Sequence, residues 1–272
     1  GDRFFYQNPL ASDGKERSPW FGCACCPVNV VRFIPSIPGY AYAHTNDVIY
    51  VNLFMGSSAK IKLKDNTVLL KQKTQYPWDG VVKITIKPEK TAEFTINVRI
   101  PGWAQDRPVP SDLYQYMKTS SESAELSVNG KTMPMDMDKG FARIKRTWKS
   151  GNIIELHLPM PVRRGICDEK VKENVDKAAL QRGPIVYCTE SADNGPNVHR
   201  LILPVDLSLK TEFREHLLGG VYVIRTRIRT WHLKDDEVFP DKQEFVAIPY
   251  YAWAHRGAGK MAVWLRRRID FP

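Results

Sequence analysis

Short stretches of alternating apolar and polar residues dominate the chain from residue 39 to residue 161. Phe94–Ile100 is the clearest case, because its apolar side chains would share one face of an extended strand and its polar side chains the other. The pattern predicts strands at Tyr40–His44, Val48–Phe54, Ala59–Leu63, Val68–Gln75, Val81–Pro88, Glu93–Ile100, Glu125–Val128, Phe141–Thr147 and Ile153–Leu158. Many short strands joined by turns are typical of a β-sandwich, which we expect over residues 39–161.

A second β segment follows over residues 162–272, where we expect a second β-sandwich domain. Its predicted strands are Ala179–Gln181, Ile185–Thr189, Val221–His232, Glu244–Ile248 and Met261–Leu265. The long polar loop Ala104–Ser123 contains two prolines, and we expect it at the rim of the first sandwich. The fold class predicted from the pattern is therefore mainly β, with two consecutive jelly-roll-like sandwiches.

The first 38 residues form a separate region. An extended piece is predicted at Phe4–Leu10. A short helix is predicted to begin at Pro27, since the fixed φ of proline suits the first turn of a helix. We expect Pro35 and Pro38 to end this helix.

Three of the five cysteines lie within four positions, at Cys23, Cys25 and Cys26. Adjacent thiols are poor disulfide partners, because the short ring strains the peptide bond between them. Two thiolates are good ligands for Zn²⁺, so a zinc site that includes Cys25 and Cys26 is the first hypothesis. A zinc-bound thiol stays deprotonated at neutral pH, so it could also act as a nucleophile. Two alternatives stay open: small buried residues at the start of a helix, and a purely structural zinc site.

Composition limits the class of protein. The chain has 272 residues, of which 43% are hydrophobic, and this is typical of a soluble globular protein. No apolar run approaches the roughly 18 residues of a membrane span, and no leader pattern is visible, so we expect no membrane partner. Five cysteines do not suggest a disulfide framework. The bacterial cytoplasm and the periplasm both stay open as locations, and a homodimer stays open as an assembly.

The net charge of +10 and the pI of about 9.3 raise nucleic-acid binding as a competing function. The distribution of the charge argues against it. Arg225, Arg227 and Arg229 alternate along a predicted strand, which would place them on one solvent-exposed face. The run Arg266–Arg268 is typical of a solvated chain end. We therefore expect no nucleic-acid partner.

Other residues with catalytic potential have simpler interpretations. His44, His157 and His232 lie within or beside predicted strands and are expected to be packed or surface histidines. Nothing in the sequence brings Glu155 and Glu190 together as the facing carboxylates of a glycosidase. Most of the seven tryptophans are expected in the core or at a domain interface and not on sugar-stacking surfaces: Trp20, Trp78, Trp103, Trp148, Trp231, Trp253 and Trp264.

Several blocks of sequence, taken in order, resemble glycoside hydrolase family 127. The resemblance begins around the cysteine cluster, in the stretches Phe4–Leu10 and Trp20–Asn29 with Arg17 and Arg32, and runs through nearly the whole chain. The later blocks are Ile49–Phe54, Tyr76–Gly80, Arg99–Trp103, Leu158–Arg163, Ala179–Cys188 and Ile248–Ala254. Several blocks in the right order are much more specific than one motif. By this resemblance, residues 1–38 are the C-terminal end of a catalytic (α/α)₆ helical barrel.

The resemblance also implies a chemistry. Members of the family resemble retaining β-L-arabinofuranosidases in which a zinc-bound cysteine is the nucleophile and a glutamic acid is the acid/base. By motif the nucleophile falls on Cys25 and a zinc ligand on Cys26, whereas Cys23 is not a ligand. The acid/base Glu and the other ligands, a Glu and a Cys two residues apart, would lie upstream in the missing N-terminal barrel. No Glu-x-Cys sequence occurs in this chain.

The resemblance therefore implies the C-terminal portion of an enzyme that releases non-reducing-end β-L-arabinofuranose, or a related sugar, from plant-type oligosaccharides or polysaccharides. The residues present here would be inactive alone. A carbohydrate-binding or scaffolding role for the β-sandwiches is the alternative from another functional class.

Overall fold

The computed structural model describes residues 2–23, 25–234 and 237–267, the side chains of residues 230–241 excepted. The chain is mainly β, as predicted, and it divides into two compact units. We call residues 25–107 and 120–160 the middle unit, and residues 1–24, 108–119 and 161–272 the C-terminal unit. The bounds expected for the three domains, 1–38, 39–161 and 162–272, stay predictions.

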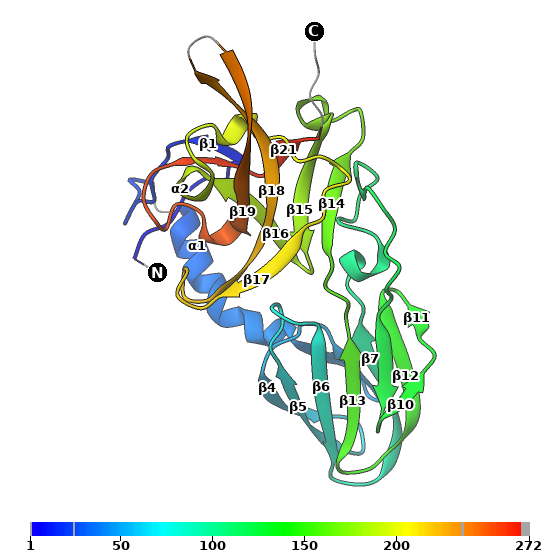
Figure 1. The fold of residues 1–272 in the computed structure, drawn as a ribbon. Helices are drawn as coiled ribbons and strands as arrows, with labels where there is room; N and C mark the ends of the chain where they lie inside the picture. The colour runs from blue at the N-terminus through cyan, green and yellow to red at the C-terminus, as the bar shows by residue number, and fades with distance from the viewer. Residues whose placement is uncertain (1, 24, 235–236, 268–272) are drawn as a thin grey trace. The chain divides into compact units, whose positions relative to one another are not determined.

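The strands of the middle unit form two sheets (Figure 1). The six-stranded sheet has the order β10-β9-β13-β6-β5-β4, and its strands are β4 (Ser57–Lys62), β5 (Thr67–Thr74), β6 (Val81–Pro88), β9 (Glu125–Val128), β10 (Lys131–Met133) and β13 (Asn152–His157). The five-stranded sheet has the order β11-β12-β7-β3-β2, and its strands are β2 (Tyr42–His44), β3 (Val48–Val51), β7 (Ala92–Arg99), β11 (Asp136–Asp138) and β12 (Phe141–Trp148). Strand β3 runs parallel to β7, and the other pairs are antiparallel.

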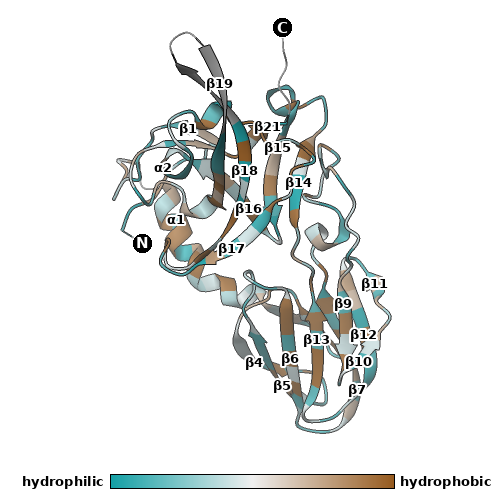
Figure 2. Cartoon of the chain, viewed as in Figure 1, coloured by the Kyte–Doolittle hydropathy of each residue, from teal (hydrophilic) through white to brown (hydrophobic). Residues whose placement is uncertain are grey.

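One hydrophobic core joins the two sheets of the middle unit, because alternate side chains of both sheets point into it. Strand β6 shows the alternation predicted from the sequence, with Val82, Ile84 and Ile86 fully buried. Figure 2 shows the apolar residues of β6 and β13 in brown. Trp148 is also fully buried, and its indole N–H donates a hydrogen bond to the Phe94 carbonyl oxygen at 3.0 Å. This tryptophan is a core residue, as predicted.

The strands of the C-terminal unit form one connected sheet of ten strands. The main path is β17-β18-β19-β16-β15-β14-β8, while β20 joins β1 to β16 and β21 pairs with β15. The bounds are β1 (Ala11–Asp13), β8 (Tyr114–Tyr116), β14 (Val162–Cys167), β15 (Lys177–Arg182), β16 (Ile185–Glu190), β17 (Lys210–Arg214), β18 (Val221–Lys234), β19 (Glu237–Pro249), β20 (Lys260–Ala262) and β21 (Trp264–Arg266).

The loop predicted at the rim of the first sandwich contributes to the other unit instead. Residues 108–119 belong to the C-terminal unit, where Tyr114–Tyr116 pairs with Gly165–Cys167 of β14. The expectation of a rim insertion was therefore wrong for this part of the loop. A three-residue strand has too few positions to show a period, and its partner lies about 50 residues away, so local pattern does not reveal it.

The longest helical stretch among the described residues runs from Cys25 to Tyr40. The α-helices are α1 (Cys25–Phe33) and α2 (Ser191–Asn194), and the 3₁₀ helices are η1 (Ile34–Tyr40), η2 (Gly102–Gln105), η3 (Lys172–Asn174), η4 (Val198–Arg200) and η5 (Tyr250–Ala252). No helix among the described residues has the length and apolarity needed to cross a membrane.

The charged positions of the long β18 strand follow the predicted alternation. Arg225, Arg227 and Arg229 are exposed, and Ile228 between them is buried. Arg225 also pairs with Glu212 of β17. The predicted basic run lies partly outside the described residues, because Arg268 is not described.

Candidate active site

The segment before the cysteine cluster folds back on itself in the C-terminal unit. Phe4 and Ser18 exchange two backbone hydrogen bonds, with N···O distances of 2.9 and 3.0 Å. The Phe21 ring lies against the rings of Phe4 and Tyr6, with centroid distances of 5.3 and 5.4 Å. Residues 4–10 do not form a regular strand. The backbone bridge and the ring cluster hold this segment in its conformation.

The fold of this segment brings Tyr6 to the first cysteine of the cluster. The Tyr6 hydroxyl donates a hydrogen bond to Cys23 Sγ at 3.8 Å. Beside them is an open cleft of about 480 Å³, lined by Phe5, Tyr6, Gln7, Lys15, Glu16, Phe21, Gly22 and Cys23. No pattern in the sequence predicts the contact between Tyr6 and Cys23, although both residues lie in blocks that resemble the family.

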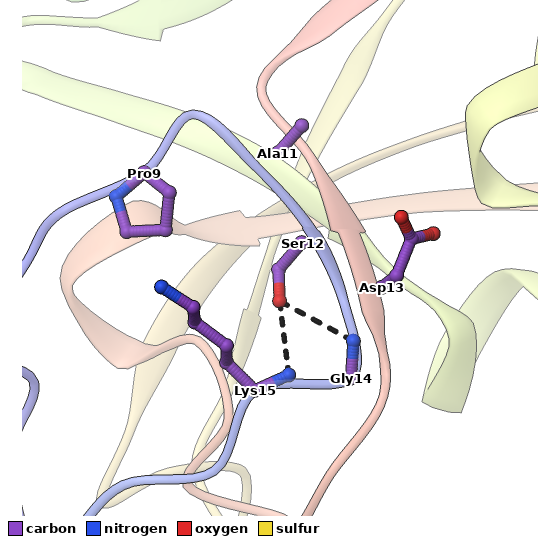
Figure 3. A pocket seen from close by; sticks show the side chains of 6 residues that line it. All are labelled: Pro9, Ala11, Ser12, Asp13, Gly14 and Lys15. Carbon is purple, nitrogen blue, oxygen red and sulfur yellow. Dashed lines mark hydrogen bonds between the residues drawn. The ribbon is translucent and has the colours of Figure 1, made fainter.

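A second cleft lies next along the same segment (Figure 3). The Ser12 hydroxyl oxygen accepts hydrogen bonds from the backbone N–H groups of Gly14 and Lys15, at 3.3 and 3.0 Å. Asp13 Oδ1 lies 3.0 Å from His199 Nε2. The Ser12 hydrogen bonds hold the turn, and the Asp13–His199 contact ties the turn to the rest of the unit. These contacts explain the conformation of the turn without a bound ligand.

The helix after the cluster begins two residues earlier than predicted. It starts at Cys25, and Pro27 is its third residue. Proline is tolerated there because the first backbone N–H groups of a helix have no partner within the helix. Cys25 and Cys26 therefore lie in the first helical turn and not in the loop before it.

Side chains of α1 reinforce this first turn. The Asn29 side-chain amide donates a hydrogen bond to the Cys25 carbonyl oxygen at 2.7 Å, and Arg32 donates to the Asn29 amide oxygen. No side chain of α1 is buried among the described residues. The thiols of Cys25 and Cys26 are thus held at an exposed, ordered helix end.

The two adjacent thiols suit a shared metal ion. Their sulfur atoms are 3.8 Å apart. Two thiolates bound to one tetrahedral zinc ion at about 2.3 Å each also place their sulfurs about 3.8 Å apart. Among the described residues, no group of three or more His, Cys, Asp or Glu side chains could hold a metal ion. These two residues could therefore supply half of a tetrahedral ligand set.

The other two cysteines, Cys167 and Cys188, lie in the sheet of the C-terminal unit. Cys188 on β16 is buried, and desolvation raises the pKa of its thiol well above the ordinary value. Cys167 at the end of β14 is partly buried, and its thiol lies 3.6 Å from the Val171 carbonyl oxygen. Desolvation also raises the pKa of Cys167. Both thiols are held in their neutral form, in which a cysteine is a poor nucleophile.

Among the described side chains, the histidines and the two glutamates considered in the sequence analysis do not contribute to the candidate site. His44 and His157 are exposed on their strands, and His232 falls among the side chains that are not described. Glu155 lies on the surface of the middle unit, 3.5 Å from Lys83. Glu190 is a buried residue of the C-terminal unit and binds Arg256. These two carboxylates have separate structural partners.

The tryptophans divide between core and surface. Trp148 and Trp253 are buried and Trp20 is exposed, whereas Trp231 falls among the side chains that are not described. Trp78, Trp103 and Trp264 are half-buried. The expected core position is therefore confirmed for Trp148 and Trp253.

Three family models match the chain in consecutive order. The model described as β-L-arabinofuranosidase, GH127 catalytic domain, matches residues 1–39. The model described as β-L-arabinofuranosidase, GH127 middle domain, matches residues 48–160, and the glycoside hydrolase family 127 C-terminal domain matches residues 162–266.

Individual relatives give the same result. The chain is 28% identical to the non-reducing end β-L-arabinofuranosidase of Bifidobacterium longum subsp. longum, in a match that covers 98% of this chain and 42% of the relative. A solved GH127 β-arabinofuranosidase is 43% identical with a TM-score of 0.93, and a GH127 β-L-arabinofuranosidase from Geobacillus stearothermophilus T6 is 39% identical with a TM-score of 0.86. These matches cover 98% of this chain and 42% and 43% of the solved chains. The chain thus spans less than half the length of these relatives.

Proposed function

Because the chain belongs to glycoside hydrolase family 127, we propose that it is the C-terminal part of a zinc-dependent, retaining β-L-arabinofuranosidase. Its substrate would be an oligosaccharide or polysaccharide with β-L-arabinofuranose, or a related sugar, at the non-reducing end. The observation that carries the proposal is the pair of thiols 3.8 Å apart in the first turn of α1, within the stretch that matches the catalytic domain of the family.

Cys25 and Cys26 would hold the zinc ion together with ligands from the upstream part of the polypeptide. The match between their sulfur separation and that of two thiolates on one zinc ion supports this assignment. When bound, zinc keeps a coordinating thiol ionised at neutral pH and fixes its direction. The Asn29 and Arg32 contacts hold the helical turn that carries both ligands.

Cys25 would be the nucleophile of a double displacement. Its Sγ forms a bond to the anomeric carbon of the sugar while the bond from that carbon to the leaving oxygen breaks, and the leaving oxygen takes a proton from a carboxylic acid. Water then attacks the same carbon, the carbon–sulfur bond breaks, and the carboxylate takes the proton of the water. Two inversions at one carbon retain its configuration.

The carboxylic acid of this mechanism would come from upstream of the present residues. The acidic residues before the cluster are Asp2, Asp13 and Glu16. Asp13 is engaged with His199, and Glu16 lines the open cleft near Cys23. The proposal therefore assigns the acid/base Glu to the upstream barrel, as the resemblance implies.

Substitution of the adjacent cysteines in the full-length protein tests the proposal. Cys26→Ser is expected to lose zinc, measured as metal per protein by elemental analysis. Cys25→Ser is expected to abolish hydrolysis of an aryl β-L-arabinofuranoside even where some zinc is kept. Cys167→Ser is the control and should keep both. Equal zinc content and equal rates in the Cys25 and Cys26 variants would contradict both assignments.

Residues 1–272 alone provide a second test. Loss of a general acid removes a factor of about 10² to 10⁴ in rate, so this piece should not hydrolyse the aryl glycoside at a rate near that of the full-length enzyme. Binding of arabinose-containing glycans by residues 39–272, without turnover in the full-length protein, would favour the carbohydrate-binding alternative. Zinc in a full-length protein whose Cys25 does not react with a sugar electrophile would favour a structural metal site.

A further inference from the structure

The sequence block Ile248–Ala254 has no role in the mechanism above, yet it makes close contacts with the segment that leads to the cysteines. The Trp253 ring, 2% exposed, stacks on the Phe5 ring with a centroid distance of 4.0 Å and an interplanar angle of 5°. The Tyr250 hydroxyl donates a hydrogen bond to the Pro9 carbonyl oxygen at 2.8 Å. Both contacts join residues more than 200 positions apart within the C-terminal unit.

Arg17 fastens the segment at a third point. Its Nε donates to the Trp253 carbonyl oxygen at 3.0 Å and its Nη2 donates to the Tyr251 carbonyl oxygen at 2.9 Å. Its guanidinium also lies over the Phe5 ring, 5.0 Å from the centroid. Arg17 thus contacts both partners of the aromatic stack. The planar fork of a guanidinium can bind two carbonyl groups at once, which a lysine ammonium does less well.

An ion cluster around the buried Glu190 side chain fixes the loop that receives Arg17. Ala254 has a left-handed φ of 56°, and its backbone N–H donates to Glu190 Oε1 at 2.5 Å. Arg256 Nη2 lies 2.5 Å from Glu190 Oε2 and 2.5 Å from Asp193 Oδ2. The carbonyl groups that Arg17 binds are therefore presented by a loop that is held on strand β16 and helix α2.

We propose that Arg17 and Trp253 are positioning residues that set the path of the chain up to Cys23, the first thiol of the cluster. The stretch from Arg17 to Cys23 is short, and the Phe4–Ser18 bridge, the ring cluster and the Tyr6–Cys23 contact bind it to the part of the segment that Trp253 holds. The inference rests on the proposed function, because Cys25, the proposed nucleophile, follows Cys23 by two residues in the sequence.

The experiment compares two arginines of the C-terminal unit in the full-length enzyme. Arg164 is the matched control: like Arg17 it donates to two backbone carbonyl groups, those of Pro204 and Leu207, and burial lowers the pKa of both arginines. We expect Arg17→Ala to lower kcat per folded molecule at least about tenfold with little change in KM, since small displacements of reacting groups have large effects on rate. Arg164→Ala should lower the melting temperature at least as much and leave kcat near that of the wild type.

The conservative variant Arg17→Lys should recover part of the lost kcat. Should Arg17→Ala fail to fold, Phe5→Leu removes the ring that stacks on Trp253 and lies under the Arg17 guanidinium, while it keeps the Arg17 hydrogen bonds. Its control is Phe213→Leu, which removes a ring contact with Tyr222 at 5.2 Å. Equal kcat per folded molecule for Arg17→Ala and Arg164→Ala, or for the two Leu variants, would overturn the proposal.

A second readout separates this inference from the proposed function. Iodoacetamide labelling of the metal-stripped full-length protein, followed by peptide mass mapping, reports the reactivity of Cys23 and Cys25. We expect Arg17→Ala to change both labelling rates more than about threefold, and Arg164→Ala to leave them unchanged. This contrast would stand even if the wild type hydrolysed no arabinofuranoside, which would refute the proposed function alone. Unchanged labelling in both variants would refute the positioning role.

Discussion

Gly80 and Leu158 lie in backbone contact in the middle unit. The Leu158 N–H donates a hydrogen bond to the Gly80 carbonyl oxygen at 2.9 Å. A Cβ atom on residue 80 would lie 1.7 Å from the Leu158 carbonyl oxygen, far inside any van der Waals contact. Leu158 is 1% exposed and belongs to the core of this unit. Only glycine fits this position without a shift of the backbone.

We therefore expect Gly80→Ala to destabilise the protein by about 3 kcal/mol or more, because the clash is with backbone and not with a flexible side chain. Gly56→Ala is the control, since a Cβ there meets no atom within 4 Å and the φ angle is unexceptional. Its free energy of unfolding should stay within about 1 kcal/mol of the wild-type value. Urea denaturation gives both values, and similar midpoints for the two variants would contradict the backbone contact.

Glu190→Gln should destabilise the protein by about 1–3 kcal/mol, because the variant loses a buried charge that pairs with Arg256. The glutamine oxygen can still accept the hydrogen bond from Ala254, and Asp193 still binds Arg256. Glu155→Gln removes an exposed pair with Lys83 and should change stability by less than about 0.5 kcal/mol. Thermal denaturation of the two variants checks the contrast, and a larger loss in the Glu155 variant would reverse our ranking.

Tyr187→Phe should remove part of the alkaline destabilisation. Desolvation raises the pKa of Tyr187 from 10.0 to about 12. The folded state therefore binds this proton more tightly than the unfolded state does. Its contribution to stability is fully present below pH about 10 and is lost as the pH rises to about 12, a change of about 3 kcal/mol. The difference in unfolding free energy between wild type and variant should follow this pH range, and a pH-independent difference would contradict it.

Cys23, Cys167 and Cys188 are expected to be dispensable for chemistry. Replacing each by Ala in the full-length enzyme should leave kcat per folded molecule nearly unchanged, whereas Cys25→Ala should abolish it. Cys188→Ala should also cost about 1 kcal/mol of stability, because the thiol is buried on β16. Loss of activity on replacing Cys23, with activity kept on replacing Cys25, would place the nucleophile on the other thiol.

Most of the longer strands could be predicted from the sequence, because they have enough residues to show their period. The alternation in Phe94–Ile100 predicted β7, which the structure places at Ala92–Arg99. Six strands were missed. The strands β1, β8, β10 and β11 have three residues each, too few to show a period, whereas β14 and β17 have six and five residues. The start of α1 was misplaced because proline is allowed at several positions of a first turn.

The local sequence predicted which residues of the candidate site could carry chemistry. It did not predict the contacts that hold the segment before them. Cys25 and Cys26 are adjacent, so their proximity follows from the covalent chain. The bond from Arg17 to Trp253 joins residues 236 positions apart, and no periodicity or spacing predicts such a contact. Arg17 and Trp253 both belong to the blocks that resemble the family, but the resemblance did not predict a contact between them.

The pairing of Ala11 with Ala262 has a consequence for biosynthesis. Residues 25–160 contain the whole middle unit, which can fold as soon as they leave the ribosome. The segment that leads to the cysteines must wait for strand β20, about 100 residues later, or about 5–20 s at ordinary rates of translation. During that interval the aromatic side chains of the segment and the Cys23 thiol lack the loop on which the segment docks. Cys23 is therefore synthesised well before the strand that orders its segment, so its thiol is open to oxidation in nascent chains.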